Sequence, residues 1–88
     1  MPSAPPPLSL AQPARYCVRT QGVFETRWLE MLSGVWAIRG CNGAPTAVTT
    51  LVGCVADQAA LMGVLEQLYS LGFPILLVEW LVDGQDLD

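Results

Sequence analysis

The chain has 88 residues, which is enough for one small domain. Its formal net charge is −4, with four arginines and no lysine, so the basic surface that nucleic-acid binding requires is not expected. Histidine is absent, which removes the commonest general base and the commonest metal ligand. Hydrophobic residues make up 52% of the chain, more than one small core can hide, and this predicts an interface with another subunit or protein.

The cysteines and the apolar runs favour a cytoplasmic protein. Cys17, Cys41 and Cys54 are odd in number and lack C-x-x-C spacing, so a disulfide scaffold is not expected. We interpret them as small buried or half-buried apolar side chains, with a metal or redox role as the alternative. No apolar run approaches the roughly 20 residues of a membrane span, and the first residues lack the charged and apolar regions of a secretory signal. We therefore expect no membrane insertion and no cofactor.

The first part of the chain predicts a tail followed by a strand. Residues 1–13 hold five of the seven prolines and are expected to be extended or disordered, with docking of this tail onto an aromatic groove as the alternative. From Arg15 to Gly22 the side chains alternate, which is typical of a half-buried strand. One face would carry Tyr16, Val18 and Thr20, and the other face would carry Cys17, Arg19 and Gln21.

The next segments predict a short helix and a hairpin. Residues 24–33 place apolar side chains at helical spacing, so we expect an amphipathic helix whose aromatic residues lie in the core. Residues 35–39 and 46–55 are β-prone runs on either side of a turn signal with Asn-Gly at its centre, which is typical of a β-hairpin. Gly53 in the second run indicates a bulge or the close packing of a helix.

The last third predicts a longer helix and a buried strand. Asp57 is placed to cap the helix N-terminus, because its carboxylate can accept from the free amides of the first turn. Gly72 and Pro74 indicate where this helix ends. The apolar run 73–80 is interpreted as a buried strand, and the acidic residues 83–88 are expected to fray. The apolar stripe of the helix comprises Leu61, Val64, Leu65, Leu68 and Leu71.

The predicted elements follow the order strand, helix, strand, strand, helix, strand, within one domain at residues 14–82. This is the order of the ferredoxin-like, or split βαβ, arrangement. We therefore expect an α+β fold with a four-stranded antiparallel sheet in the order 4-1-3-2 and both helices on one face. The other face of the sheet would then be open.

Three stretches resemble a set of small uncharacterised bacterial proteins. Thr49–Leu65 is similar to their pattern T-x-L-x-G-x-V-x-D-Q-A-A-L-x-G-L-L, and Leu71–Glu79 is similar to their L-G-x-x-L-x-S-V. Gly22–Trp28 is similar to their G-x-L-x-x-R-W. Together the three stretches extend the resemblance over roughly residues 14 to 82. The resemblance implies kinship but no activity.

The chain departs from that pattern at Met62, where a polar residue is common, and at Leu77, where serine is common. Both differences make the surface more apolar, which favours a protein partner. The predicted topology also resembles that of ACT domains, which bind amino acids at subunit interfaces. That resemblance is one of fold alone, and it implies a regulatory domain that binds a small metabolite at a dimer interface.

The open face of the predicted sheet is the candidate site. The first and last strands should be neighbours, so Arg19 and Glu79 are expected to form a cross-strand ion pair that sets orientation in an interface. The hypothesis is a surface for a dimer or another partner, and the alternative is a solvated face with an ordinary surface ion pair. The surface would be centred on Arg19, Val52, Ile75, Leu77 and Glu79.

Catalytic chemistry is not indicated. Asp57 is explained by its capping role, and Cys54 lacks the histidine that would activate it as a nucleophile. The turn at 40–43 lacks the Lys and Ser/Thr of a phosphate-binding loop. The sequence therefore predicts a non-catalytic module that self-associates or docks on a larger protein. ACT-like metabolite binding is the alternative, and a small enzyme of the same fold is a third possibility.

Overall fold

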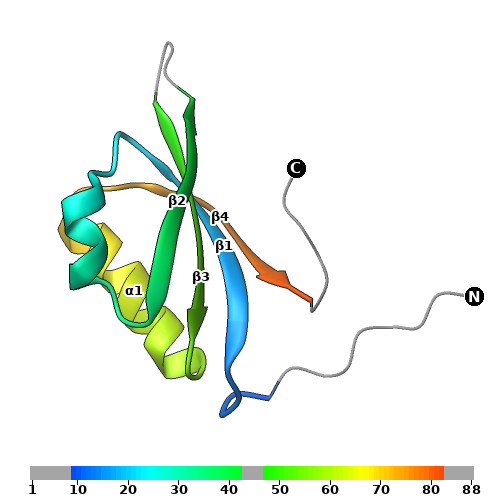
Figure 1. Ribbon diagram of the computed structural model, residues 1–88. Helices are drawn as coiled ribbons and strands as arrows, with labels where there is room; N and C mark the ends of the chain where they lie inside the picture. Colours follow the sequence, from blue (N-terminus) through cyan, green and yellow to red (C-terminus); the bar gives the residue numbers. More distant parts are fainter. Residues whose placement is uncertain (1–8, 43–46, 83–88) are drawn as a thin grey trace, which may run out of the picture.

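The computed structural model describes residues 9–42 and 47–82 (Figure 1). These residues form four strands, one α-helix and one short 3-10 helix. In chain order the elements are β1 (Ala14–Gln21), η1 (Thr26–Met31), β2 (Val35–Asn42), β3 (Val48–Val55), α1 (Gln58–Ser70) and β4 (Ile75–Leu81). The predicted tails at 1–13 and 83–88, and the Asn-Gly turn, lie wholly or partly outside the described residues.

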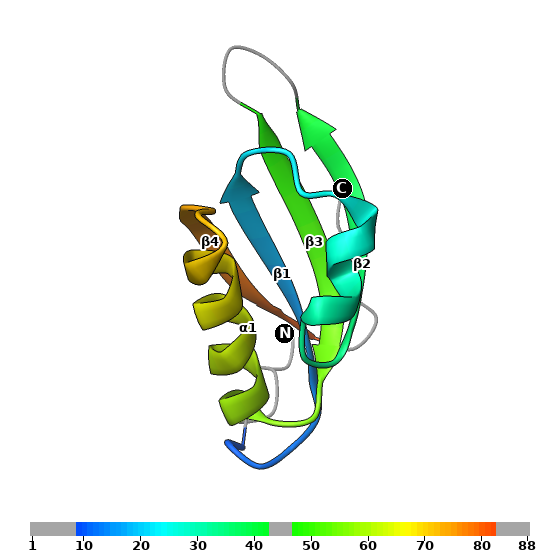
Figure 2. The ribbon, with the colours of Figure 1, turned by 90° about the vertical axis from the view of Figure 1, so that its left-hand side faces the viewer.

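The four strands form one antiparallel sheet, so the α+β prediction is confirmed. The strand order is β2-β3-β1-β4, which is the expected order 4-1-3-2 counted from the other edge. Both η1 and α1 lie over the same face of the sheet (Figure 2). We call the opposite face, over which the described residues place no helix, the open face.

The core lies between the sheet and the two helices. Tyr16 and Val18 of β1, with Leu51 and Val55 of β3, belong to one cluster of buried residues together with the apolar side of α1. Because side chains alternate along a strand, the residues between them point to the open face. The buried residues of α1 are Leu61, Val64 and Leu68.

Helix α1 begins and ends at the residues that carry the sequence signals. The Asp57 carboxylate accepts a hydrogen bond from the Ala60 amide at 2.8 Å, which satisfies one free donor of the first turn. At the other end, Gly72 has a φ of 88°, in the left-handed region that favours glycine. The Phe73 amide then donates to the Leu68 carbonyl at 3.0 Å and closes the helix end.

The predicted helix at 24–33 is wrong in type and length. The structure has the six-residue 3-10 helix η1 instead, and no backbone amide of its first turn donates a hydrogen bond to the side chain of its cap residue Glu25. A segment this short forms too few hydrogen bonds to offset the cost of starting an α-helix. Its aromatic residues still pack in the core. The ring centroid of Phe24 lies 5.5 Å from that of Trp28 and 5.3 Å from that of Phe73.

The predicted strand at residues 73–80 is confirmed as β4, but the prediction that it is buried is wrong, because β4 is an edge strand. Within the part of the chain that the structure describes, β4 pairs with β1 alone. An apolar run indicates burial only where neighbours cover both faces of the strand. Five consecutive residues of β4 are exposed, and the first four are the apolar residues Ile75, Leu76, Leu77 and Val78.

Gly53 marks neither a bulge nor a helix contact. The sheet irregularities lie elsewhere, in the β1–β4 and β2–β3 pairings. A Cβ added at Gly53 would lie 2.4 Å from the ring of Trp36, its neighbour on β2. The glycine therefore makes room for the indole of Trp36, which lies against the backbone of β3 at this position.

Candidate interaction surface

The strand register brings most of the predicted surface residues together. Directly paired residues of an antiparallel sheet point to the same face. Two neighbouring rows of paired residues cross β3, β1 and β4 on the open face. The first row is Val52, Cys17 and Glu79, and the second row is Thr50, Arg19 and Leu77.

Ile75 does not follow this alternation. The β1–β4 register shifts between Arg19 and Thr20, so that Ile75 pairs with Thr20 although Leu77 pairs with Arg19. Thr20 is fully buried and alternates with the residues of the open face. Because of this register shift, alternation from Leu77 no longer places Ile75 on the open face.

The predicted surface residues differ in how much of each side chain is exposed to solvent. Leu77 is 37% exposed, Glu79 is exposed and Arg19 is half-buried. Val52 is only 9% exposed, because it forms a small buried cluster with Cys17 and Leu81. The prediction of Val52 as a surface contact is wrong, and Val52 instead supports the residues around it.

Sequence reasoning missed one exposed apolar residue of the open face. Val35 pairs with Cys54, which lies two residues after Val52 on β3 and so on the same face, and Val35 is 79% exposed. The signal that could have found Val35 is the alternation of the β2 segment when it is paired with β3.

The predicted ion pair between Arg19 and Glu79 is not formed. Glu79 lies opposite Cys17, one row away from Arg19. Among residues 9–42 and 47–82, the one ion pair within 4.0 Å joins Arg27 to Glu25 on the helical side of the molecule. The guanidinium of Arg19 and the carboxylate of Glu79 are therefore both left for interactions beyond this part of the chain.

The cysteines differ in exposure, which corrects the expectation that all three are buried or half-buried. Cys17 is fully buried, whereas Cys41 and Cys54 are exposed. Burial raises the pKa of the Cys17 thiol, while the nearby Arg19 lowers that pKa and Glu79 raises it. The thiolate, which is the reactive form, is therefore disfavoured at Cys17.

This difference predicts site-selective alkylation. Iodoacetamide should modify Cys41 and Cys54 in the folded protein and leave Cys17 unmodified, because Cys17 is fully buried and its thiol pKa is raised. Mass spectrometry of digested peptides measures the modification at each site, and the same reaction in denaturant should label Cys17 as well. Rapid labelling of Cys17 in the folded protein would contradict its burial.

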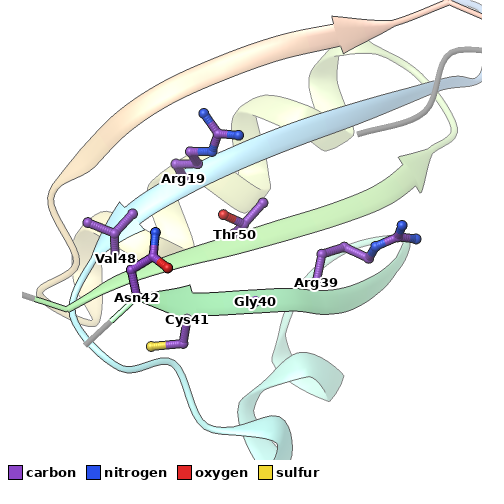
Figure 3. A pocket seen from close by; sticks show the side chains of 7 residues that line it. All are labelled: Arg19, Arg39, Gly40, Cys41, Asn42, Val48 and Thr50. Carbon is purple, nitrogen blue, oxygen red and sulfur yellow. The ribbon is translucent and has the colours of Figure 1, made fainter. Parts of the chain in front are cut away.

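A hollow of about 490 Å³ lies on the open face, where it includes Thr50 and Arg19 of the second row (Figure 3). It is bordered by β1, β2 and β3, and Figure 3 shows Cys41 pointing away from Asn42 and Thr50. The sequence did not predict this hollow, because the second strand was expected to end at Arg39 whereas β2 continues to Asn42. The lining residues are Arg19, Arg39, Gly40, Cys41, Asn42, Val48 and Thr50.

Fold and surface together define a small α+β domain whose sheet has one helix-covered face and one open face with apolar, basic and acidic side chains. The chain belongs to the family described as Domain of unknown function (DUF8691), whose model matches residues 15–79. No curated protein and no solved structure matches the chain significantly. In the part of the chain that the structure describes, neither helix has the length and apolar composition needed to cross a membrane.

Proposed function

We propose that this protein is a non-catalytic interaction module that associates with a second copy of itself through the open face. The observation that carries the proposal is the exposure of large apolar side chains beside charged ones. Leu77 and Val35 are 37% and 79% exposed on a face that η1 and α1 leave uncovered. Covering such side chains with a second surface removes their apolar area from water.

The charges of the open face favour a second copy of the chain as the occupant. Arg19 and Arg39 come from β1 and β2, whereas Glu79 comes from β4 at the opposite edge of the sheet. Consider two open faces that stack with a twofold axis parallel to the strands. This axis sets β2 of one copy over β4 of the other, so Arg39 faces the acidic Glu79 of the second copy at both ends of the interface, while Arg19 of β1 lies over β3.

The fold itself supports a ferredoxin-like arrangement in which η1 stands in place of the first helix. The order of elements and the strand order β2-β3-β1-β4 agree with that arrangement. Folds of this kind carry many unrelated functions. The proposal of self-association therefore depends on the open face and not on the fold.

Self-association is tested by replacing Leu77 on the open face. We expect the wild-type chain to form a dimer, and Leu77→Glu to raise its dissociation constant by about tenfold or more, because the interface would bury a carboxylate in place of an apolar side chain. Arg19→Glu should act in the same direction, because it replaces a half-buried positive charge of the open face with a negative one. Size exclusion with light scattering over a concentration series measures the dissociation constant.

The control is Met62→Glu, which places the same charge at an exposed apolar residue of α1, on the helical side. This variant should dimerise like the wild-type chain. A wild-type monomer at every concentration would reject the dimer and leave a different protein as the occupant of the open face. An equal effect of Met62→Glu and Leu77→Glu would place the interface elsewhere.

A second candidate function is a regulatory domain that binds a small metabolite at a dimer interface. The hollow on the open face favours it, because a volume of about 490 Å³ lies within the usual range of small-molecule sites. The hollow also lies on the face that the proposed dimer would cover.

A further inference from the structure

The hollow on the open face differs in charge from the chain as a whole. Arg19 and Arg39, two of the four arginines, line it together with no acidic residue, although the chain carries a net charge of −4. Within residues 9–42 and 47–82, neither arginine has an Asp or Glu oxygen within 4.0 Å, whereas Arg27 is paired with Glu25. The hollow is therefore a positively charged place on an acidic protein.

Uncharged donors line the same hollow. Thr50 lies directly opposite Arg19 in the β1–β3 register, and Asn42 comes from the end of β2 (Figure 3). The side chains of Thr50, Asn42, Arg19 and Arg39 make no hydrogen bond with another group in the described part of the chain. Four hydrogen-bonding side chains thus border one cavity with their donors free for a ligand.

An irregularity in β2 accounts for the place of Arg39. The β2–β3 register shifts between Ile38 and Gly40, and Arg39 has no paired residue in β3. A bulge of this kind changes the direction in which a side chain points. Gly40 lies opposite Thr50, and a Cβ added at Gly40 would meet nothing within 4 Å. The absence of a side chain at Gly40 keeps this side of the hollow open.

From these observations we infer that the hollow binds a small molecule through an oxyanion, which is a carboxylate or a phosphate group. The guanidinium group is a planar fork of donors that matches two oxygens of either group. The Thr50 hydroxyl and the Asn42 amide supply further donors for the remaining oxygens. With a volume of about 490 Å³, the hollow accommodates a ligand larger than the anionic group itself.

An oxyanion is the ligand class that the second candidate function, metabolite binding, would use. The inference rests on that function where the ligand is a metabolite. It does not depend on the dimer, because all four donors belong to one chain. Mass and anion binding are separate measurements. A monomer that binds the anion would reject the dimer alone. A chain that binds no anion either as the wild-type dimer or as the Leu77→Glu monomer would reject the site alone.

The test is isothermal titration calorimetry of the full chain with two probes, inorganic phosphate and succinate, each against chloride at equal ionic strength. We expect saturable binding of at least one probe with one site per chain. Arg19→Gln and Arg39→Gln should each weaken that binding by about tenfold, because each removes one of the two positive charges that line the hollow. Arg27→Gln, at an exposed arginine paired with Glu25, should leave binding unchanged.

Each result of the titrations either assigns a ligand class or contradicts the site. Binding of phosphate alone assigns a phosphorylated ligand, binding of succinate alone assigns a carboxylate ligand, and binding of both supports the shared oxyanion chemistry. No saturable heat above the chloride control would overturn the inference. An equal loss in Arg27→Gln would also overturn it, since it would show a general charge effect. Arg39 is exposed, so Arg39→Gln keeps the test valid if Arg19→Gln impairs folding.

Discussion

Replacing Gly53 with alanine is expected to lower the free energy of unfolding by roughly 3 kcal/mol, because the added methyl group overlaps atoms that cannot move away. The Cβ would lie 2.4 Å from the Trp36 ring and 2.5 Å from the Val35 carbonyl oxygen. Trp36 is buried, and its indole N–H donates to the Ser33 carbonyl at 2.7 Å. The ring is held by that hydrogen bond, and the carbonyl belongs to the backbone of β2.

Chemical denaturation of wild-type and Gly53→Ala protein measures this loss. The control is Gly40→Ala, at another glycine of the same β2–β3 pair. An added Cβ at Gly40 meets no atom within 4 Å, and neither glycine has a positive φ. Gly40→Ala should therefore leave stability unchanged or raise it slightly by restricting the unfolded chain. If the two variants were equally stable, the close packing of Trp36 on Gly53 would be wrong.

Local sequence signals predicted those elements whose bounds depend on a few adjacent residues. Asp57 and Gly72 mark the two ends of α1, because capping and the left-handed conformation are properties of single residues. The apolar stripe of that helix identified the side that packs on the sheet, with Leu61, Val64 and Leu68 buried. The strand order then followed from the order of elements alone.

The candidate surface depends on the pairing between strands, which a short stretch of sequence does not determine. Arg19 and Glu79 were expected to pair, but the cross-strand register sets Glu79 against Cys17. The register shift after Arg19 also reassigned Ile75. Register arises from side-chain packing across strands and is reset wherever one strand has an extra residue. The hollow could not be predicted from the sequence for the same reason, because Arg39 lies at a register shift of β2.

The exposure of β4 could not be predicted for a second reason, which lies outside the strand itself. The run Ile75–Val78 is apolar enough for a buried strand, yet its burial depends on what lies beyond the edge of the sheet. In the described part of the chain, nothing pairs with the outer side of β4. The exposed apolar side chains of this edge strand thus account for part of the high hydrophobic content of the chain. One of them, Leu77, lies on the open face.

Replacing Thr49 with valine is expected to lower the free energy of unfolding by about 2 to 3 kcal/mol, because it leaves two backbone groups without their partner. The Thr49 hydroxyl donates to the Gly22 carbonyl at 2.6 Å and accepts from the Phe24 amide at 3.2 Å. It thereby ties the connection after β1, which leads to η1, onto β3. Valine has nearly the same shape, so the packing of the fully buried side chain is preserved and only the hydrogen bonds are lost.

A matched control for this variant lies in the neighbouring strand at Thr20, which pairs with Thr49 and is equally buried. The Thr20 hydroxyl has no hydrogen-bond partner among the described residues. Thr20→Val removes a buried polar group that is unsatisfied there, so it should leave stability unchanged or raise it by up to about 1 kcal/mol. Denaturation curves of the two variants, measured against the wild-type protein, should therefore shift in different directions or by clearly different amounts. Equal losses would mean that valine is harmful at both sites because of its shape, and the two hydrogen bonds of Thr49 would then not account for its contribution.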